Sequence, residues 1–230
     1  MKIRELHKWD VSTAEAVEIQ KSLAAQVSRL NEVRQPRYIA GVDISARRAR
    51  DTATAAVVVL EYPGMRLVDY SVIRTETTFP YVPGLLTFRE APLILKAWAN
   101  LKFEPDLLLV DGQGIAHPRR IGLASHLGLL LDKPTIGCAK SLLSGTFEEM
   151  PGGAGSCVDI TEGEEVIGAA VRTRTGVKPV YVSIGHRVDL AAAVHWVIAC
   201  GRGYRIPEPL RLAHQAAYGS LKTGKINVKV

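Results

Sequence analysis

The chain has 230 residues, of which 47% are apolar, and it carries a formal net charge of +6. This length and apolar fraction suit a single mixed domain over residues 1–230 and exclude a disordered chain. The longest aliphatic runs, at 55–60 and 127–131, are far too short to cross a bilayer, so no membrane association is expected. The positive balance favours a polyanionic partner, although many basic proteins bind nothing anionic.

The three cysteines show no Cys-x-x-Cys spacing, which argues against a disulfide framework and against a structural zinc site. The N-terminal segment also lacks the apolar stretch of a secretion signal. We therefore expect a reduced, cytoplasmic protein that is a monomer.

Basic residues gather at four places along the chain. Any one of these clusters is typical of a solvated loop, whereas several of them beside reactive side chains favour a nucleic-acid partner. The last cluster lies in a basic tail, about residues 222–230, that we expect to be flexible. The clusters are Arg47, Arg48 and Arg50; Arg119 and Arg120; Arg172, Arg174 and Lys178; and Lys222, Lys225 and Lys229.

The first elements in chain order are a helix and a group of strands. Ser12 and Glu15 have the spacing of a capping box, and apolar residues then recur at three- and four-residue intervals, which predicts an amphipathic helix over 13–31. Short turns join the strands that follow, so these strands are expected to form an antiparallel meander. The predicted strands cover 38–45, 54–62 and 66–76.

The middle of the chain alternates helices and apolar strands, which is the rhythm of a parallel sheet. The order of elements is that of a ribonuclease H-like α/β fold, a mixed sheet in which an antiparallel three-strand meander precedes parallel strands flanked by helices. In that fold the first and fourth strands lie side by side. The remaining predicted helices cover 88–102, 121–131, 188–200 and 208–221, and the remaining strands 107–110, 135–139, 157–160, 166–173 and 180–184.

A proline loop, residues 79–84, separates the meander from the first of these helices. Each of its two prolines fixes its own φ and restricts the residue before it, so the loop has few conformations open to it. The ring of Tyr81 near its tip can therefore be offered to a partner at little entropic cost. Such a loop is suited to act as a wedge, formed by Pro80, Tyr81, Val82 and Pro83.

Two aspartates end apolar strands, and either could be a structural residue. Asp43 could cap the end of its strand, and Asp111, which precedes a glycine, could belong to a turn. Taken together they are better interpreted as a shared site for a divalent cation, because Mg²⁺ prefers carboxylate oxygens and keeps several waters. Burying either carboxylate without a partner would be costly.

Further candidates have structural alternatives of their own. Glu90 is expected in the first turn of a helix, where it is either a dipole partner or a third acid near the metal. Lys140 follows a strand and could neutralise a phosphate or be solvated. His117 and Gly112 belong to a glycine-rich loop after Asp111, where glycine allows close approach of a planar ligand or simply a turn.

Longer motifs accompany these residues, and through them the chain resembles the endonuclease V family over nearly its whole length. Motifs of this length and specificity make chance a poor explanation. Two positions depart from the pattern: valine stands at 82 where isoleucine is frequent, and some relatives carry aspartate where His214 stands. The motifs are Gly41-Val42-Asp43, Pro80-Tyr81-Val82-Pro83-Gly84, Phe88-Arg89-Glu90, and the segments 110–119, 136–143 and 178–186.

The resemblance implies a metal-dependent repair nuclease that recognises deaminated bases in DNA, above all hypoxanthine. Such an enzyme cuts the second phosphodiester bond on the 3′ side of the lesion and leaves 3′-hydroxyl and 5′-phosphate ends. Mg²⁺ is the implied cofactor, with Mn²⁺ as a substitute. By the same resemblance the metal ligands are Asp43 and Asp111, the catalytic set adds Glu90, His214 and Lys140, Tyr81 is the wedge residue, Gly84 and Gly112 line the base pocket, and His117 is a further substrate contact.

Other functions stay open at this point. An inosine-specific ribonuclease or a ribonuclease H-like resolvase would use the same fold on a different substrate. A non-catalytic nucleic-acid-binding module belongs to another class, and the acids Asp43, Glu90 and Asp111 speak against it, because a binder gains nothing from carboxylates beside phosphates.

Overall fold

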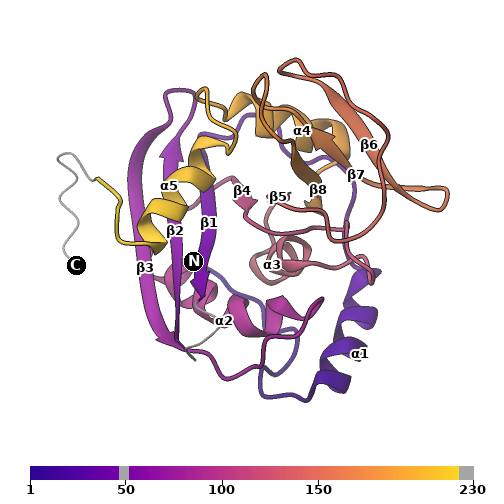
Figure 1. Ribbon diagram of the computed structural model, residues 1–230. Helices are drawn as coiled ribbons and strands as arrows, with labels where there is room; N and C mark the ends of the chain where they lie inside the picture. Colours follow the sequence, from indigo (N-terminus) through magenta and orange to yellow (C-terminus); the bar gives the residue numbers. More distant parts are fainter. Residues whose placement is uncertain (47–51, 223–230) are drawn as a thin grey trace.

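One eight-stranded mixed sheet runs through the molecule, with helices on both of its faces (Figure 1). The computed structural model describes residues 1–46 and 52–222. The strands follow the order β3-β2-β1-β4-β5-β8-β7-β6, and the expected ribonuclease H-like α/β fold is confirmed. The strands are β1 (Tyr38–Ala46), β2 (Thr52–Glu61), β3 (Arg66–Glu76), β4 (Leu107–Val110), β5 (Thr135–Ala139), β6 (Cys157–Glu162), β7 (Glu165–Val171) and β8 (Val180–His186).

The pairing of the strands explains how distant carboxylates meet. As expected, β1, β2 and β3 form an antiparallel meander, and β4 lies parallel to β1 and to β5. The register between β1 and β4 ends with Val42 opposite Val110. Asp43 and Asp111 therefore follow the last paired residues on neighbouring parallel strands, whose carboxyl ends lie at the same edge of the sheet.

The later strands extend the same sheet beyond β5. Short strands were predicted in this part of the chain without a position in the fold. In the structure β8 pairs antiparallel with β5, and β7 and β6 follow as a second antiparallel group. Because further strands flank β1 and β4 on both sides, Asp43 and Asp111 lie near the middle of the strand order, toward the carboxyl ends of these two strands.

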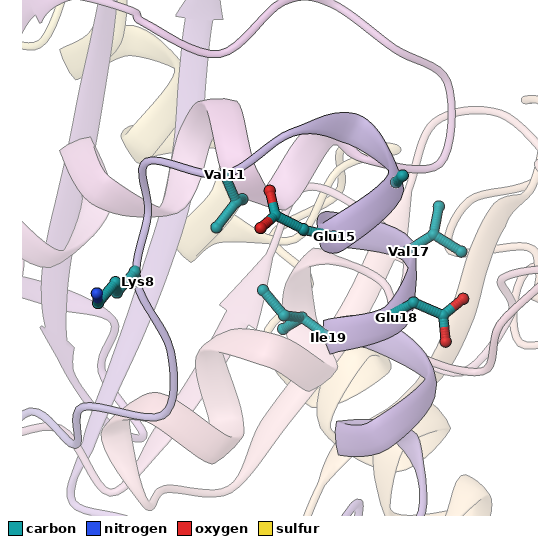
Figure 2. Close-up of a pocket in the computed structure, with 7 residues that line it drawn as sticks. Lys8, Val11, Glu15, Val17, Glu18 and Ile19 are labelled. Atoms are coloured by element: carbon teal, nitrogen blue, oxygen red, sulfur yellow. The ribbon is translucent and has the colours of Figure 1, made fainter.

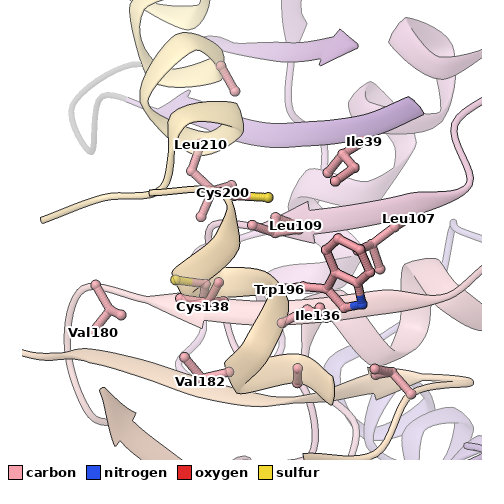
Figure 3. Close-up of a cluster of buried hydrophobic side chains, with 14 of the residues drawn as sticks. Ile39, Leu107, Leu109, Ile136, Cys138, Val180, Val182, Trp196, Cys200 and Leu210 are labelled. Carbon is pink, nitrogen blue, oxygen red and sulfur yellow. The ribbon is translucent and has the colours of Figure 1, made fainter. Parts of the chain in front are cut away.

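Alternating side chains divide the core into two layers, one on each face of the sheet. In β2, Ala56, Val58 and Leu60 belong to one layer, and the residues between them belong to the other, as expected when successive side chains point to opposite faces. Figure 3 shows the first layer, in which Trp196 and Leu210 from two different helices pack over the strands. The helices are α1 (Thr13–Ala24), α2 (Leu86–Ala99), α3 (Leu123–Leu131), α4 (Leu190–Ala199) and α5 (Glu208–Ala217).

Most predicted boundaries agree with the structure to within three residues, but two helices are shorter than predicted. The first was expected to reach residue 31 and ends at Ala24, because the following segment hydrogen-bonds to the end of β8: Ser28 N–H donates to His186 Nδ1 at 3.1 Å. Leu30, assigned to the apolar face, is 76% exposed. The last helix ends at Ala217 rather than at 221.

None of the helices among the described residues is long and apolar enough to cross a membrane. The basic residues Arg47, Arg48 and Arg50, and the tail from residue 223 onward, lie outside the described residues.

Candidate active site

The structure brings the carboxyl groups of Asp43 and Asp111 together at the edge of the sheet. The backbone N–H of Asp111 donates to the carbonyl of Val42 at 2.9 Å, which fixes the two strand ends side by side. Burial, followed by a hydrogen bond with Asp111 and the negative charge of Asp111, raises the pKa of Asp43 to about 8. Two carboxylates so close cannot both ionise easily without a cation.

Glu90 adds a third acid from α2. It is 8% exposed, and burial, followed by the charge of Asp111, raises its pKa to about 8. The helix starts at Leu86, two residues earlier than predicted, so Glu90 lies beyond the first turn and is buried against the sheet. A helix-dipole role is therefore excluded, and the three residues Asp43, Glu90 and Asp111 form what we call the acid cluster.

Lys140 supplies a nearby positive charge. Its ammonium group contacts the carboxylate of Asp111 and lies 3.9 Å from Oδ1 of Asp43. Partial burial acts to lower the pKa of Lys140, but the charge and hydrogen bond of Asp111 outweigh it and the pKa is raised. The lysine is thus bound to the cluster while its side chain stays 40% exposed, and one ammonium faces more carboxyl groups than it can neutralise.

His214 reaches the acid cluster because α5 packs unusually close to β1. A side chain at Gly41 would place its Cβ 2.0 Å from the carbonyl oxygen of Pro209, so only glycine permits this approach. The helix then directs Nδ1 of His214 to 2.9 Å from Oδ2 of Asp43. Partial burial, followed by the charge of Lys140, lowers the pKa of His214. Among the six histidines, His214, which the family resemblance implies as catalytic, is the one whose ring hydrogen-bonds to Asp43.

The acids fit a hydrated cation better than a closed metal cage. Within residues 1–46 and 52–222, no group of three or more His, Cys, Asp or Glu side chains is arranged to hold an ion. Asp43 and Asp111 form a pair, and Mg²⁺ is usually bound by one or two carboxylates with several waters retained. A bound cation would favour the ionised form of Asp43, whose pKa burial and Asp111 raise.

A small pocket of about 130 Å³ lies between the proline loop, the start of α2 and the loop after β4. Its lining is mostly apolar, and at its rim the ring of Tyr81 is 54% exposed. Behind the loop, Phe79 is buried with its ring 5.5 Å from that of Phe88, which anchors the loop to α2. This proline-loop pocket is lined by Tyr81, Val82, Pro83, Gly84, Leu86, Thr87, Gly112, Gln113, His117, Gly122, Leu123 and Leu143.

The carbonyl of Gly84 is held by three donors from the protein. Gln20 Nε2 donates at 3.0 Å, His117 Nε2 at 2.9 Å and Arg119 Nη2 at 2.8 Å. Gly84 itself has a φ of +80°, which favours glycine. Since these three donors already occupy it, this carbonyl is not free to read a bound base.

His117 stabilises this loop through its hydrogen bond to Gly84, and its ring is neutral. Burial lowers its pKa to about 4. Its Nδ1 accepts a hydrogen bond from the backbone N–H of Arg119 at 3.1 Å, so the proton lies on Nε2 and is donated to Gly84. The side chain also lines the pocket, and its role as a substrate contact stays a prediction.

Gln20 and Arg119 were missed as parts of the site. Gln20 is fully buried, and its Oε1 accepts a hydrogen bond from Arg119 Nε at 2.6 Å. The signal was present, because Gln20 follows Ala16 by four residues on the apolar stripe of the helix, where a polar side chain needs buried partners.

Several residues of the basic clusters also bind within the protein instead of facing solvent. Arg120 contacts Glu162 and Glu165, and Arg172 donates to backbone carbonyls. These arginines are therefore largely used to hold the fold, which weakens the argument from clustering alone.

A wider, open groove of about 720 Å³ lies against α1, away from the acids. Figure 2 shows Val11 of the N-terminal segment and Ile19 of the helix on its wall, with the carboxylates of Glu15 and Glu18 at the surface. None of the predicted site residues lines this groove.

Comparisons with known proteins agree with one another. Residues 21–215 match the family model of endonuclease V. The chain is 56% identical to endonuclease V of Methanothrix thermoacetophila over 214 residues, which covers 93% of this chain and 94% of that protein. It is 52% identical to endonuclease V of Gloeobacter violaceus, with 91% and 86% of the two chains covered.

Solved structures show the same relationship. Endonuclease V from Streptomyces avermitilis superposes with a TM-score of 0.87 at 40% identity and covers 96% of this chain and 98% of its own. Endonuclease V of Ciona intestinalis, solved in complex with a 24mer DNA containing an inosine followed by a ribo-adenosine, gives a TM-score of 0.78 at 32% identity, with 90% and 97% covered. By family model, sequence and structure, the chain belongs to the endonuclease V family of nucleases.

Proposed function

We propose that this protein is a metal-dependent endonuclease that recognises deaminated bases in DNA, above all hypoxanthine, and cuts the second phosphodiester bond on the 3′ side of the lesion. The observation that carries the proposal is the acid cluster beside the proline-loop pocket, since Gly112 of the pocket directly follows Asp111. A nuclease that acts on a flipped base needs such a pocket next to its reaction centre. The relative from Ciona intestinalis, solved with inosine-containing DNA, supports this substrate.

Recognition would begin with the proline loop. Tyr81, at the exposed rim of the pocket, fills the gap that the extruded nucleotide leaves in the stack. Extrusion costs a few kcal/mol and is least costly for a mispaired or damaged base, which is one source of selectivity. The wedge role of Pro80, Val82 and Pro83 is to hold the tyrosine in place, since the prolines limit the loop's conformations.

The base itself would enter the proline-loop pocket between Gly84 and Gly112. Because the Gly84 carbonyl is bound by Gln20, His117 and Arg119, backbone N–H groups are left to meet the 6-oxo group of hypoxanthine. Adenine offers an amino group at that position and would leave a buried donor unpaired, at a cost of about 1–3 kcal/mol.

Cleavage would take place at the acid cluster, where Asp43 and Asp111 would hold Mg²⁺, with Mn²⁺ as a substitute. Nucleases of this family depend on a metal ion, and such an ion, when bound, lowers the pKa of water and stabilises the leaving oxygen. Lys140, bound to Asp111, offsets charge on the phosphate. Glu90 and His214, on opposite sides of the aspartates, orient water and accept or return its proton.

An inosine-specific ribonuclease is the second candidate. The nucleic acid bound by the Ciona intestinalis relative carries a ribo-adenosine after its inosine, so a ribose at this position is accommodated in that protein.

The free thiols of Cys138, Cys157 and Cys200 fit a reducing compartment, and we place the enzyme in the cytoplasm.

The decisive experiment maps the break. An end-labelled duplex with one deoxyinosine is incubated with the protein and Mg²⁺, beside a matched deoxyadenosine duplex, an inosine-containing RNA and a four-way junction. We expect cleavage of the deoxyinosine strand at the second bond 3′ to the lesion, and none in EDTA. Preferential cutting of the RNA or the junction would replace the proposed substrate, and cutting that survives EDTA would exclude the metal.

A further inference from the structure

A polar groove lies beside the acid cluster and has no part in the site described so far. It has a volume of about 370 Å³, within the range of sites that hold small ligands, about 300–1,000 Å³. Unlike the proline-loop pocket, it is lined by hydroxyl groups and an arginine. This side groove is formed by Ser45, Thr52, Thr54, Val72, Arg74, Ala216, Ala217, Tyr218 and Gly219.

The strand register places the side groove on the same face of the sheet as the side chain of Asp43. Ser45 pairs with Thr54, and Thr54 pairs with Arg74, so their side chains form one row across β1, β2 and β3. Asp43 lies two residues before Ser45 on the same strand, and residues two apart point to the same face. The polar row is therefore the next row of side chains beyond Asp43.

Helix α5 joins the groove to the acid cluster. It lies across β1 and β2 (Figure 1), and its C-terminal end forms one wall of the groove. The rings of His214 and Tyr218 on this helix are 4.4 Å apart, and His214 contacts Asp43. A polymer leaving the acids along this face would pass directly from His214 to the groove.

The proline-loop pocket lies on the other side of the acids. It is built from the loop after β4 and the start of α2, whereas the side groove lies over β1, β2 and β3. In the sheet, β1 lies between β4 and β2. The order along this edge is pocket, acids, groove, which is the order of lesion, cut and downstream nucleotides in the proposed reaction.

Arg74 is suited to meet a phosphate because nothing in the described part of the chain pairs with it. It is exposed, and no ion pair or hydrogen bond joins its guanidinium to residues 1–46 or 52–222. Other arginines near the predicted site, Arg119, Arg120 and Arg205, are bound within the protein. A guanidinium without a partner among the described residues, beside the hydroxyl groups of Ser45, Thr52, Thr54 and Tyr218, is a typical surface for phosphate and sugar oxygens.

We propose that the side groove binds the sugar–phosphate backbone of the strand on the 3′ side of the cut, with Arg74 contacting a phosphate and the hydroxyl groups of Ser45 and Thr54 contacting backbone oxygens. This inference rests on the proposed function, since the lesion in the proline-loop pocket sets the direction of the strand. The groove would hold the 5′-phosphorylated product until it is released.

The test compares Arg74→Ala with the wild type on two deoxyinosine substrates. The long substrate extends several nucleotides beyond the cut on its 3′ side, and the short substrate has a single nucleotide there. On the long substrate we expect kcat/KM to fall about tenfold, as for loss of a charge-assisted hydrogen bond. The slope of the logarithm of the binding constant against the logarithm of the salt concentration should become shallower by about 0.7–0.9. On the short substrate the variant should match the wild type. Thr54→Val should show a smaller loss with the same dependence on length.

Arg34→Ala is the matched control, because Arg34 is also exposed and lies before β1, at the opposite edge of the sheet from the acids. It should behave as wild type on both substrates. An Arg74→Ala variant that matches the wild type on the long substrate, or loses equally on both, overturns the proposal.

A binding measurement separates this proposal from the proposed function. Fluorescence anisotropy of a labelled, 5′-phosphorylated oligonucleotide is recorded with the wild type, Arg74→Ala and Arg34→Ala. If the wild type cuts no inosine substrate but only Arg74→Ala weakens this binding, the proposed function fails and the groove assignment holds. If the wild type cuts deoxyinosine DNA and Arg74→Ala binds the oligonucleotide normally, the groove assignment alone fails.

Discussion

The proline-loop pocket and the acid cluster lie next to each other but are built on opposite electrostatic principles. In the pocket wall, the Gly84 carbonyl accepts hydrogen bonds from three protein donors, and among the described lining residues Oε1 of Gln113 is buried without a partner. In the acid cluster, burial and mutual repulsion raise the pKa of both Asp43 and Glu90 to about 8. The first region is held mainly by hydrogen bonds within the protein, and in the second the carboxyl groups outnumber the ammonium group of Lys140.

The difference teaches how the two tasks are divided. A pocket that selects a base by shape and by a few N–H groups has to be rigid before the base arrives, because rigidity fixed in advance costs no binding energy. A centre that cuts a phosphodiester bond gains from unneutralised acids, because these attract the cation that the reaction needs. Disturbing the two regions should therefore have different consequences.

The largest expected effect comes from the acids. Asp111→Ala or Asp43→Ala should lower cleavage at least about 10³-fold, because the several kcal/mol of charge stabilisation that a bound metal supplies is lost. Lesion binding should remain, since the proline-loop pocket is intact. Single-turnover cleavage in Mg²⁺ and anisotropy with a deoxyinosine strand measure the two quantities. Asp159→Ala, an exposed acid on β6, is the control, and normal cutting by either variant would disprove the metal assignment.

Tyr81 should affect selectivity rather than the chemical step. Tyr81→Ala removes the ring that replaces the flipped base, and we expect the preference for inosine over adenine to drop roughly tenfold to hundredfold, in line with about 1–3 kcal/mol for stacking of a base on an aromatic ring. Tyr81→Phe should retain the preference. Tyr204→Ala, another exposed tyrosine, should behave as wild type. An unchanged preference in Tyr81→Ala would refute the wedge role.

A smaller effect is expected when the hydrogen bonds that Gln20 makes behind the pocket are removed. Gln20→Ala leaves the Gly84 carbonyl and Arg119 each short of a partner, which should lower the free energy of unfolding by about 1–3 kcal/mol and raise KM more than it lowers kcat. Denaturant unfolding and steady-state kinetics measure these changes. Gln26→Ala, on the exposed side of the same region, is the control. A variant with normal KM and reduced stability would show that Gln20 only supports the fold.

The last prediction concerns pH and the metal-free protein. Asp43 and Glu90 have a folded pKa of about 8, above the 3.8 and 4.5 of their unfolded forms, so stability is greatest when both are protonated and is lost as pH rises towards 8. His117, His126 and His186 have pKa values lowered from 6.5, so their rings are neutral in the folded protein near pH 6.5 while the unfolded chain still binds protons there. They therefore add little slope only above about pH 7.5.

The melting temperature in EDTA should therefore fall between about pH 7.5 and 8.5. Added Mg²⁺ should restore most of this loss, because the ion favours the charged acids. Glu90→Gln should flatten the pH dependence in EDTA. A melting temperature that rises with pH in EDTA would contradict the acid cluster as described.

Much of the fold was predictable because its signals are local. The apolar run of β4 and the capping box of Ser12 and Glu15 both have the expected structure. The first helix was predicted too long because Val27 and Leu30 continue the apolar period, whereas residues near Ser28 instead hydrogen-bond to the distant His186. Such a competing partner cannot be seen in the spacing of residues.

The sequence alone determined the strands, the proline loop and the chemical character of the candidates, because periodicity, proline and the residue types act over a few neighbours. Only the tertiary structure decided that Asp43 meets Asp111 and His214, since this depends on strand register and on the close approach that Gly41 allows. It also decided that Arg119 is bound internally and that the guanidinium of Arg74 has no partner among residues 1–46 and 52–222. Which charges are neutralised depends on residues far apart in the chain, and those contacts exist only once it has folded.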